Sequence, residues 1–243
     1  MKLTVIIPVS GDISDDVTGN RAVLPPLLAP DTELEFVGLE RGFPTIESET
    51  QALVNSPEIL RAAAAAWERG SDGIFIHCFD DPAVYACREL LPIPVLGGYA
   101  PAMHTAALLA DRYAVLSTDR AGILNEERKA RAYGFSPAAI RCVDMGVADL
   151  EEHTETLLAH MEAACRELWE QERITAVVPG CTGMYAAAPA LRERLKAQGL
   201  PVTVVEPLTA GITELERLAR LGLRGPVPGV PVTMADLPGR KGN

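Results

Sequence analysis

Gly73-Ile-Phe-Ile-His-Cys78 and Ala176-Val-Val-Pro-Gly-Cys181 are two short, mostly apolar runs that each end in a cysteine. Continuous apolar runs rich in β-branched residues are typical of strands that are covered on both faces. Residues that favour the start of a helix follow each run: Asp81-Pro82 after the first and Thr182 after the second. The two runs predict a parallel α/β fold with a cysteine at the end of each of two strands.

Strand and helix patterns alternate along most of the chain. Strands are predicted at Leu3–Pro8, Glu33–Leu39, Gly73–His77, Pro94–Gly97, Tyr113–Leu116, Ile140–Asp144, Ala176–Pro179 and Val202–Val205. Helices are predicted at Leu60–Glu68, Pro82–Leu90, Pro101–Leu109, Ala121–Tyr133, Leu150–Glu170, Met184–Ala197 and Ala210–Arg220. For the first helix, Ser56 is the predicted N-cap and Pro57 the first helical residue. This alternation indicates right-handed βαβ units and an open parallel sheet.

The order of elements repeats in the two halves of the chain. Two strands and a helix lead to the strand before Cys78, and the same series, starting near Tyr113, leads to the strand before Cys181. We interpret this as two pseudo-symmetric flavodoxin-like lobes, each a parallel sheet flanked by helices. The first lobe is predicted at residues 1–98 with a C-terminal helix and tail at 207–243, and the second lobe at 99–206. The tail after residue 223 is rich in proline and glycine and predicts a loop.

Both cysteines fall where an open parallel sheet binds ligands, outside the carboxyl ends of its strands. If the lobes face each other, Cys78 and Cys181 would flank one small ligand in the cleft. Two acid/base groups on opposite sides of a carbon are the simplest arrangement for inverting it. A helix N-terminus close to each sulfur would stabilise the thiolate form. Cys87, Cys142 and Cys165 lie within predicted helices or strands and are expected to act as small apolar residues.

Composition excludes several other classes of protein. A formal net charge of -11 disfavours a nucleic-acid or anionic-membrane surface, and no apolar run is long enough to span a bilayer. Five cysteines without a C-x-x-C pair or zinc-like spacing favour a reduced, cytoplasmic protein and give no reason to expect a metal. The glycines form no G-x-G-x-x-G pattern, and no lysine follows an interior strand, so neither a dinucleotide nor pyridoxal phosphate is expected.

Several motifs resemble those of the aspartate/glutamate racemase superfamily, and within it the hydantoin racemase branch. They are Cys78-Phe-Asp-Asp-Pro82, Tyr99–Thr118, Gly180-Cys-Thr-Gly-Met184 and Gly42-Phe-Pro-Thr-Ile-Glu-Ser48. The resemblance extends to about residue 207. It implies two α/β lobes, no cofactor, a homo-oligomer, and one cysteine that deprotonates each enantiomer of a small-molecule substrate.

The chain departs from the branch at three places near the expected site. The turn after the first strand is Pro8-Val-Ser-Gly-Asp12 where the branch has Asn-Pro-Asn-x-Ser, Asp80 replaces a glycine, and Phe43 separates Gly42 from proline. Amino-acid racemases of the superfamily carry Cys-Asn-Thr at the first cysteine. Phe79 stands in place of that asparagine, which favours a neutral cyclic imide or hydantoin over a free amino acid.

Further residues are candidates for contact with the substrate. Ser10 and Thr118 follow corresponding strands of the two halves and would orient substrate oxygens, unless they serve only in turns or caps. Thr182 would donate to the substrate, cap its helix, or do both. Within the matching motifs, Phe79, Asp80, Ile46 and Gly183 are also predicted to contact substrate.

The sequence therefore predicts a cofactor-independent racemase of 5-substituted hydantoins or allantoin-like cyclic ureides, with Cys78 and Cys181 as the two acid/base groups. Alternatives within the superfamily are an amino-acid racemase, a maleate-type cis–trans isomerase that uses one cysteine as a nucleophile, and an arylmalonate-type decarboxylase. Cys78 disfavours the decarboxylase, which normally lacks the first cysteine. A small-molecule binding protein on the same scaffold is an alternative from a different class.

Overall fold

A computed structural model describes residues 1–150 and 153–225 of the chain. The chain divides into two compact units. The first unit comprises Met1–Gly97 and the chain from Ile212 onward, and the second comprises Gly98–Gly211. The sequence had suggested a return to the first lobe at residue 207, five residues before the observed boundary. Most of the predicted C-terminal loop, from residue 226 onward, lies outside the described residues.

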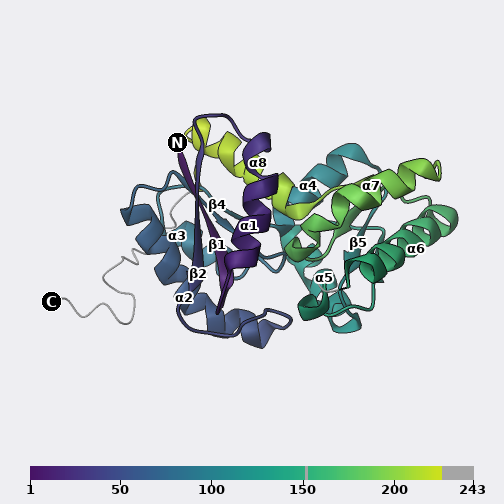
Figure 1. Cartoon of the computed structure of the whole chain (residues 1–243), viewed down its shortest axis with the longest axis horizontal. Coiled ribbons are helices and arrows are strands. Elements are labelled where there is room, and N and C mark those ends of the chain that lie inside the picture. The colour runs from purple at the N-terminus through teal and green to yellow at the C-terminus, as the bar shows by residue number, and fades with distance from the viewer. Residues whose placement is uncertain (151–152, 226–243) are drawn as a thin grey trace. The chain divides into compact units, whose positions relative to one another are not determined.

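The first unit contains a four-stranded parallel sheet in the order β2-β1-β3-β4. The strands are β1 (Lys2–Ser10), β2 (Glu33–Leu39), β3 (Gly73–Ile76) and β4 (Val95–Gly97). The helices are α1 (Ser14–Val23), α2 (Glu49–Glu68), α3 (Val84–Leu90) and α8 (Pro207–Arg220), of which α8 begins in the second unit, and a 3-10 turn η1 spans Pro25–Leu27. Figure 1 shows these elements in chain order by colour.

The second unit repeats the same order with β6-β5-β7-β8. Its strands are β5 (Tyr113–Ser117), β6 (Ala139–Cys142), β7 (Ala176–Pro179) and β8 (Thr203–Val204). Its helices are α4 (Tyr99–Leu109), α5 (Arg120–Tyr133), α6 (Thr154–Glu172) and α7 (Ala188–Ala197), with 3-10 turns η2 (Val147–Asp149) and η3 (Thr182–Ala186). The predicted pair of parallel sheets with one shared topology is confirmed.

Apolar packing against both faces explains the continuous hydrophobic strands. In the first unit, α2 and α3 cover the face that carries Ile74 and Ile76. On the other face, Leu215 of α8 lies beside Leu3 and Gly73. In the second unit, α6 and α7 bury the face of β5 and β7 that carries Leu116 and Val177. The interior of these strands is largely apolar, with Thr4 of β1 as a buried, hydrogen-bonded exception, so most polar side chains lie at the strand ends and in the loops.

Helices α1 and α2 differ from the prediction. Helix α2 begins at Glu49, not near Leu60, and its N-cap is Ser48, whose hydroxyl accepts a hydrogen bond from the Gln51 N–H at 3.3 Å. Pro57 lies inside this helix, where its missing N–H leaves the carbonyl of Leu53 without its helical partner. Leu53 is 73% exposed, so water can satisfy that carbonyl. Helix α1 was not predicted, because it is largely polar and Asn20 is its only buried residue.

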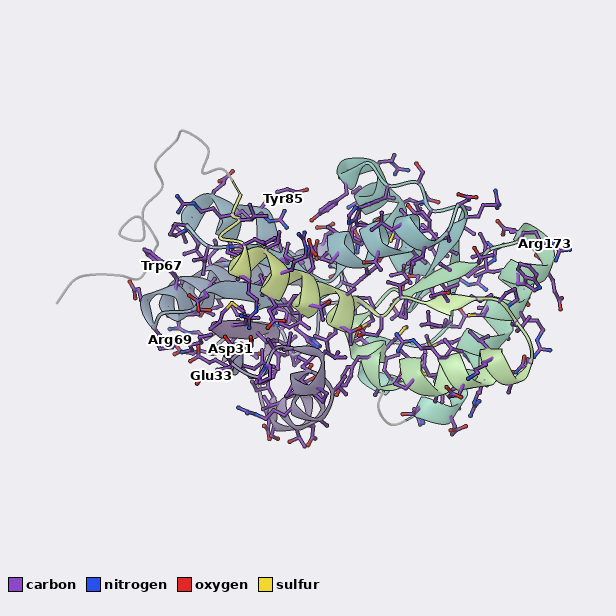
Figure 2. All side chains as sticks on the ribbon, turned by 90° about the horizontal axis from the view of Figure 1, so that it is seen from above. Asp31, Glu33, Trp67, Arg69, Tyr85 and Arg173 are labelled. Atoms are coloured by element: carbon purple, nitrogen blue, oxygen red, sulfur yellow. The ribbon has the colours of Figure 1, made fainter. Side chains whose placement is uncertain are left out.

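Glu216 connects α8 to the loop before β2 by hydrogen bonds. Its carboxylate accepts hydrogen bonds from the Ala29 N–H at 3.0 Å, the Thr32 hydroxyl and the Arg220 guanidinium. Arg220 also pairs with Asp31, which Figure 2 labels next to the yellow α8 helix. Burial alone would raise the pKa of Glu216, but the hydrogen bonds from Thr32, Ala29 and Arg220 outweigh it and lower that pKa. The carboxylate therefore stabilises the folded chain in its ionised form.

Replacing Glu216 by alanine should lower the free energy of unfolding by about 1–3 kcal/mol at neutral pH, because the N–H of Ala29 loses its acceptor. Since the folded pKa lies below the ordinary value of 4.5, this contribution is complete above that pH and is lost as the pH falls through the folded pKa. Urea denaturation at several pH values measures both effects. The control is Glu214→Ala, which removes a partly exposed pair with Arg217 and should cost less than about 1 kcal/mol. Equal losses for the two variants would contradict the role of Glu216.

Candidate active site

Cys78 follows β3 at the carboxyl edge of the first sheet. Strand β3 is fully buried and pairs with β1 from Leu3–Gly73 to Ile6–Ile76. Beyond the strand, the N–H of Cys78 donates to the carbonyl of Ile76 at 2.8 Å, so the chain turns sharply at the cysteine. Cys78 is half-buried. Its thiol thus lies at the carboxyl edge of the sheet, directly after a buried strand that is paired on both sides.

The loop after Cys78 differs from the predicted helix start at Asp81-Pro82. Helix α3 begins at Val84, and its N-cap is Ala83, which makes no side-chain capping bond. Asp81 and Ala83 both have left-handed backbone angles, with φ of 50° and 59°. Such angles are uncommon for residues other than glycine. The helix therefore starts six residues after Cys78, and the loop between them contains two residues with left-handed backbone angles.

Cys181 lies at the corresponding edge of the second sheet. Strand β7 pairs with β5 from Tyr113–Ala176 to Leu116–Pro179. Gly180 follows the strand, and a Cβ at this position would lie 2.8 Å from the carbonyl oxygen of Leu116, so only glycine fits. The N–H of Gly180 donates to that same oxygen at 2.7 Å. This close approach fixes the chain immediately before the second cysteine.

The sulfur of Cys181 receives a backbone hydrogen bond. The N–H of Gly183 donates to it at 3.3 Å, and Cys181 is the N-cap of η3. Thr182, the predicted N-cap, is instead the first residue of that turn and is only 3% exposed. An N–H aimed at sulfur favours the thiolate over the thiol. The second cysteine thus has built-in support for negative charge.

Ser10 ends β1 and holds a loop against the same edge of the first sheet. Its hydroxyl donates to the carbonyl of Gly42 at 2.7 Å, and its N–H donates to the carbonyl of Phe43 at 3.1 Å. The predicted motif at 42–48 therefore lies beside the end of β1. Within that loop Phe43 is 40% exposed, whereas Ile46 is 7% exposed.

Asn55 anchors this loop and was missed by sequence reasoning. It lies on α2, is fully buried, and accepts a hydrogen bond from the Phe43 N–H at 2.8 Å. Its amide donates to the carbonyls of Pro8 and Phe43 at 2.9 and 3.1 Å. Gly42, with φ of 133°, leaves room for this amide, since a Cβ there would lie 2.4 Å from the Asn55 oxygen. An asparagine on the otherwise Ala-rich inner face of a helix was the available signal.

The predicted site residues gather at two sheet edges. In the first unit these are Ser10, Ile46, Cys78, Phe79 and Asp80. In the second unit these are Thr118, Cys181, Thr182 and Gly183. Contact with a substrate stays a prediction for all of them, and among them Phe79, Thr182 and Ile46 are buried. Thr118 follows β5 and its carbonyl accepts the N–H of Met145 at 2.9 Å.

The other three cysteines are held as thiols. Burial raises the pKa of Cys87 and of Cys165 to about 12. Burial also raises the pKa of Cys142, as does its contact with the Asp144 carboxylate, 3.1 Å from the sulfur. None of the three is therefore a thiolate near neutral pH.

His77 precedes Cys78 but supplies no positive charge to it. The ring is buried, and burial lowers its pKa to about 4, so it is neutral above that pH. It packs edge-on against Phe75, with ring centroids 6.2 Å apart.

Within the described ranges, no group of three or more His, Cys, Asp or Glu side chains is placed to hold a metal ion. No helix in the same ranges has the length and apolar character needed to cross a membrane.

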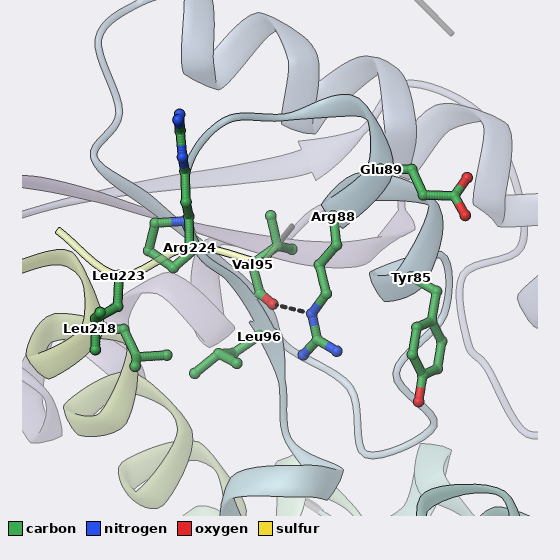
Figure 3. Close-up of a pocket in the computed structure, with 10 residues that line it drawn as sticks. Tyr85, Arg88, Glu89, Val95, Leu96, Leu218, Leu223 and Arg224 are labelled. Carbon is green, nitrogen blue, oxygen red and sulfur yellow. Dashed lines mark hydrogen bonds between the residues drawn. The ribbon is translucent and has the colours of Figure 1, made fainter. Parts of the chain in front are cut away.

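A separate groove of about 480 Å³ lies in the first unit, among α3, β4 and the end of α8. Figure 3 shows Arg88 between Val95 and Tyr85, with its guanidinium donating to the Val95 carbonyl at 2.8 Å. Leu218 and Arg224 line the opposite side. No cysteine lines this groove, so it is distinct from the two strand ends that carry Cys78 and Cys181.

A comparison with protein families decides the classification. The model of the Asp/Glu/Hydantoin racemase family matches residues 20–215. The chain belongs to this family. It is accordingly an enzyme of the isomerase class, a racemase.

Relatives of this racemase are found among characterised proteins and solved structures. It is 28% identical over 194 residues to the hydantoin racemase of Pseudomonas sp. (strain NS671), covering 79% of this chain and 76% of the relative. It is 28% identical over 230 residues to that of Paenarthrobacter aurescens, covering 91% and 92% of the two chains. The allantoin racemase from Klebsiella pneumoniae superposes with a TM-score of 0.85 at 29% identity, covering 94% and 91%. The predicted family and branch are confirmed.

Replacing Asn55 by alanine should free the 42–48 loop, because three backbone groups of Pro8 and Phe43 lose their partner. We expect a loss of about 2–4 kcal/mol in the free energy of unfolding and faster tryptic cleavage after Arg41. The control is Ser56→Ala on the same helix, which removes one bond to the Ala52 carbonyl and should leave the cleavage rate unchanged. Unaltered cleavage in Asn55→Ala would show that the loop is held by other contacts.

Proposed function

We propose that this racemase inverts C5 of 5-substituted hydantoins or allantoin-like cyclic ureides by proton transfer between Cys78 and Cys181, without a cofactor. The observation that carries the proposal is the equivalent position of the two thiols. Each follows the third strand of a sheet with the order 2-1-3-4, at the carboxyl edge where such sheets bind ligands. The hydantoin and allantoin racemases among its relatives support a cyclic ureide as the substrate.

Proton transfer between two thiols balances without any added reagent. One thiolate removes the C5 proton and leaves the bonding electron pair in an enolate that is delocalised onto the neighbouring carbonyl. The opposite thiol then donates its proton to the other face of C5, so the enzyme ends with the same number of protons and the charge on the other sulfur. Because C5 lies beside a carbonyl, modest stabilisation of the enolate oxygen by backbone N–H groups is sufficient.

The local environments suit these roles. The Gly183 N–H at 3.3 Å supports a thiolate at Cys181. Phe79, which follows Cys78, offers no hydrogen bond to an α-carboxylate, and this favours a neutral ring over a free amino acid. Cys87, Cys142 and Cys165 have raised pKa values, so they do not compete as bases near neutral pH.

The proposal is tested by incubating the enzyme in D₂O with each enantiomer of several 5-substituted hydantoins, allantoin and glutamate. Optical rotation and the NMR signal of the α-proton are followed together, against enzyme-free samples. We expect loss of rotation coupled to loss of the proton signal for at least one ureide and for neither enantiomer of glutamate. If every ureide stays protonated and optically pure, the substrate class is wrong, and maleate becomes the next compound to test.

Single replacements test the two thiols. Cys78→Ser and Cys181→Ser should each reduce racemisation by at least about a thousandfold, because hydroxyl groups do not ionise near neutral pH. The matched control is Cys142→Ser, which also lies at the carboxyl end of a strand and should retain activity. Turnover close to that of the wild type in both site variants would rule out the two-thiol assignment.

A further inference from the structure

The carboxylate of Asp81 is buried in the loop that carries Cys78. Asp81 is 7% exposed, and its backbone adopts φ of 50°. Aspartate and asparagine tolerate this left-handed region better than most residues. Helix α3 begins three residues later, and its N-cap is Ala83. Asp81 is thus a buried acidic residue with a left-handed backbone in the turn between Cys78 and the helix.

Gly97 provides the space that the Asp81 carboxylate fills. Gly97 is the last residue of β4 and pairs with Ile76, the last residue of β3. A Cβ at Gly97 would lie 2.1 Å from Oδ1 of Asp81 and 2.8 Å from its Cγ. The carboxylate thus lies over the end of β4, where only a glycine leaves room.

Backbone hydrogen bonds connect Asp81 to its neighbours on both sides. Its N–H donates to the carbonyl of Cys78 at 3.4 Å, and its carbonyl accepts the N–H of Val84 at 3.2 Å. Asp81 therefore links the cysteine, the first turn of α3 and the end of β4. The backbone of Asp81 is thereby connected directly to the carbonyl of Cys78.

We propose that Asp81 is a positioning residue for Cys78, and that its carboxylate, seated against Gly97, sets the direction in which the thiol leaves the sheet. The consequence for the reaction rests on the function proposed above, whereas the effect on the thiol itself does not. An error of about 1 Å at a reacting group costs about a hundredfold in rate, so a brace of this kind is relevant to turnover.

Gly97→Ala tests whether the contact between the Asp81 carboxylate and Gly97 positions Cys78. The added methyl group displaces the Asp81 side chain, so kcat should fall about a hundredfold while KM changes little. The readout that does not depend on substrate is the alkylation of each cysteine by iodoacetamide as a function of pH, followed by mass spectrometry. We expect the alkylation curve of Cys78 to shift and that of Cys181, an internal control in the other unit, to remain as in the wild type.

A double-mutant cycle tests the coupling between the two residues. In an Asp81→Ala background the tightest remaining contact of the methyl group is Val84 Cγ2 at 3.2 Å, which a small shift relieves, so Gly97→Ala should change kcat by less than about threefold there. Asp81→Asn keeps both the shape and the tolerance for positive φ and should retain most of the activity.

Gly73→Ala is the matched control. It also crowds a buried glycine, 3.1 Å from Leu215 and Leu3, but at the amino end of β3, far along the strand from Cys78. It should lower the melting temperature without shifting the Cys78 curve. Equal shifts at Cys78 and Cys181 in Gly97→Ala, or the same cost of Gly97→Ala in both backgrounds, would overturn the proposal. If the Cys78 curve shifts as expected and no ureide is turned over, the positioning role stands and the proposed function fails.

Discussion

The pairing of β1 with β3 and of β5 with β7 is the constraint on which the rest of the chain depends. These central strands are parallel, covered on both faces, and contribute mainly apolar side chains to the core. Polar chemistry is possible only where they end, and both end at the carboxyl edge of their sheets with a cysteine within two residues. The backbone at each cysteine is fixed by short contacts, from Cys78 to Ile76 and from Gly180 to Leu116.

The two thiols occupy equivalent places but have different surroundings. Cys181 has a backbone N–H directed at its sulfur within a tight turn. Cys78 is followed by a loop with two left-handed residues and a buried carboxylate at Asp81. A chemically asymmetric pair of this kind matches a cycle in which one sulfur starts as thiolate and the other as thiol. The asymmetry also gives each cysteine its own test by selective alkylation.

The repeated topology could be predicted from sequence because buried parallel strands are continuous apolar runs, and helices with apolar faces separate them. The place of the two cysteines at strand ends could be predicted for the same reason, since each follows such a run. The predicted start of α2 is wrong because proline is typical of a first helical turn, whereas here the exposed carbonyl of Leu53 tolerates Pro57 inside the helix. Asn55 and the seat of Asp81 on Gly97 could not be predicted, because both depend on contacts between residues more than ten positions apart.

The most direct test of the two-thiol account is the fate of each enantiomer in enzymes that retain a single site cysteine. Pure enantiomers of a 5-substituted hydantoin that the wild type racemises would be incubated in D₂O with Cys78→Ala and with Cys181→Ala, and α-proton loss would be measured separately from inversion. The account predicts that each variant exchanges the proton of one enantiomer without inverting it, and that the two variants choose opposite enantiomers. Exchange of the same enantiomer by both variants, or inversion by either, would contradict it.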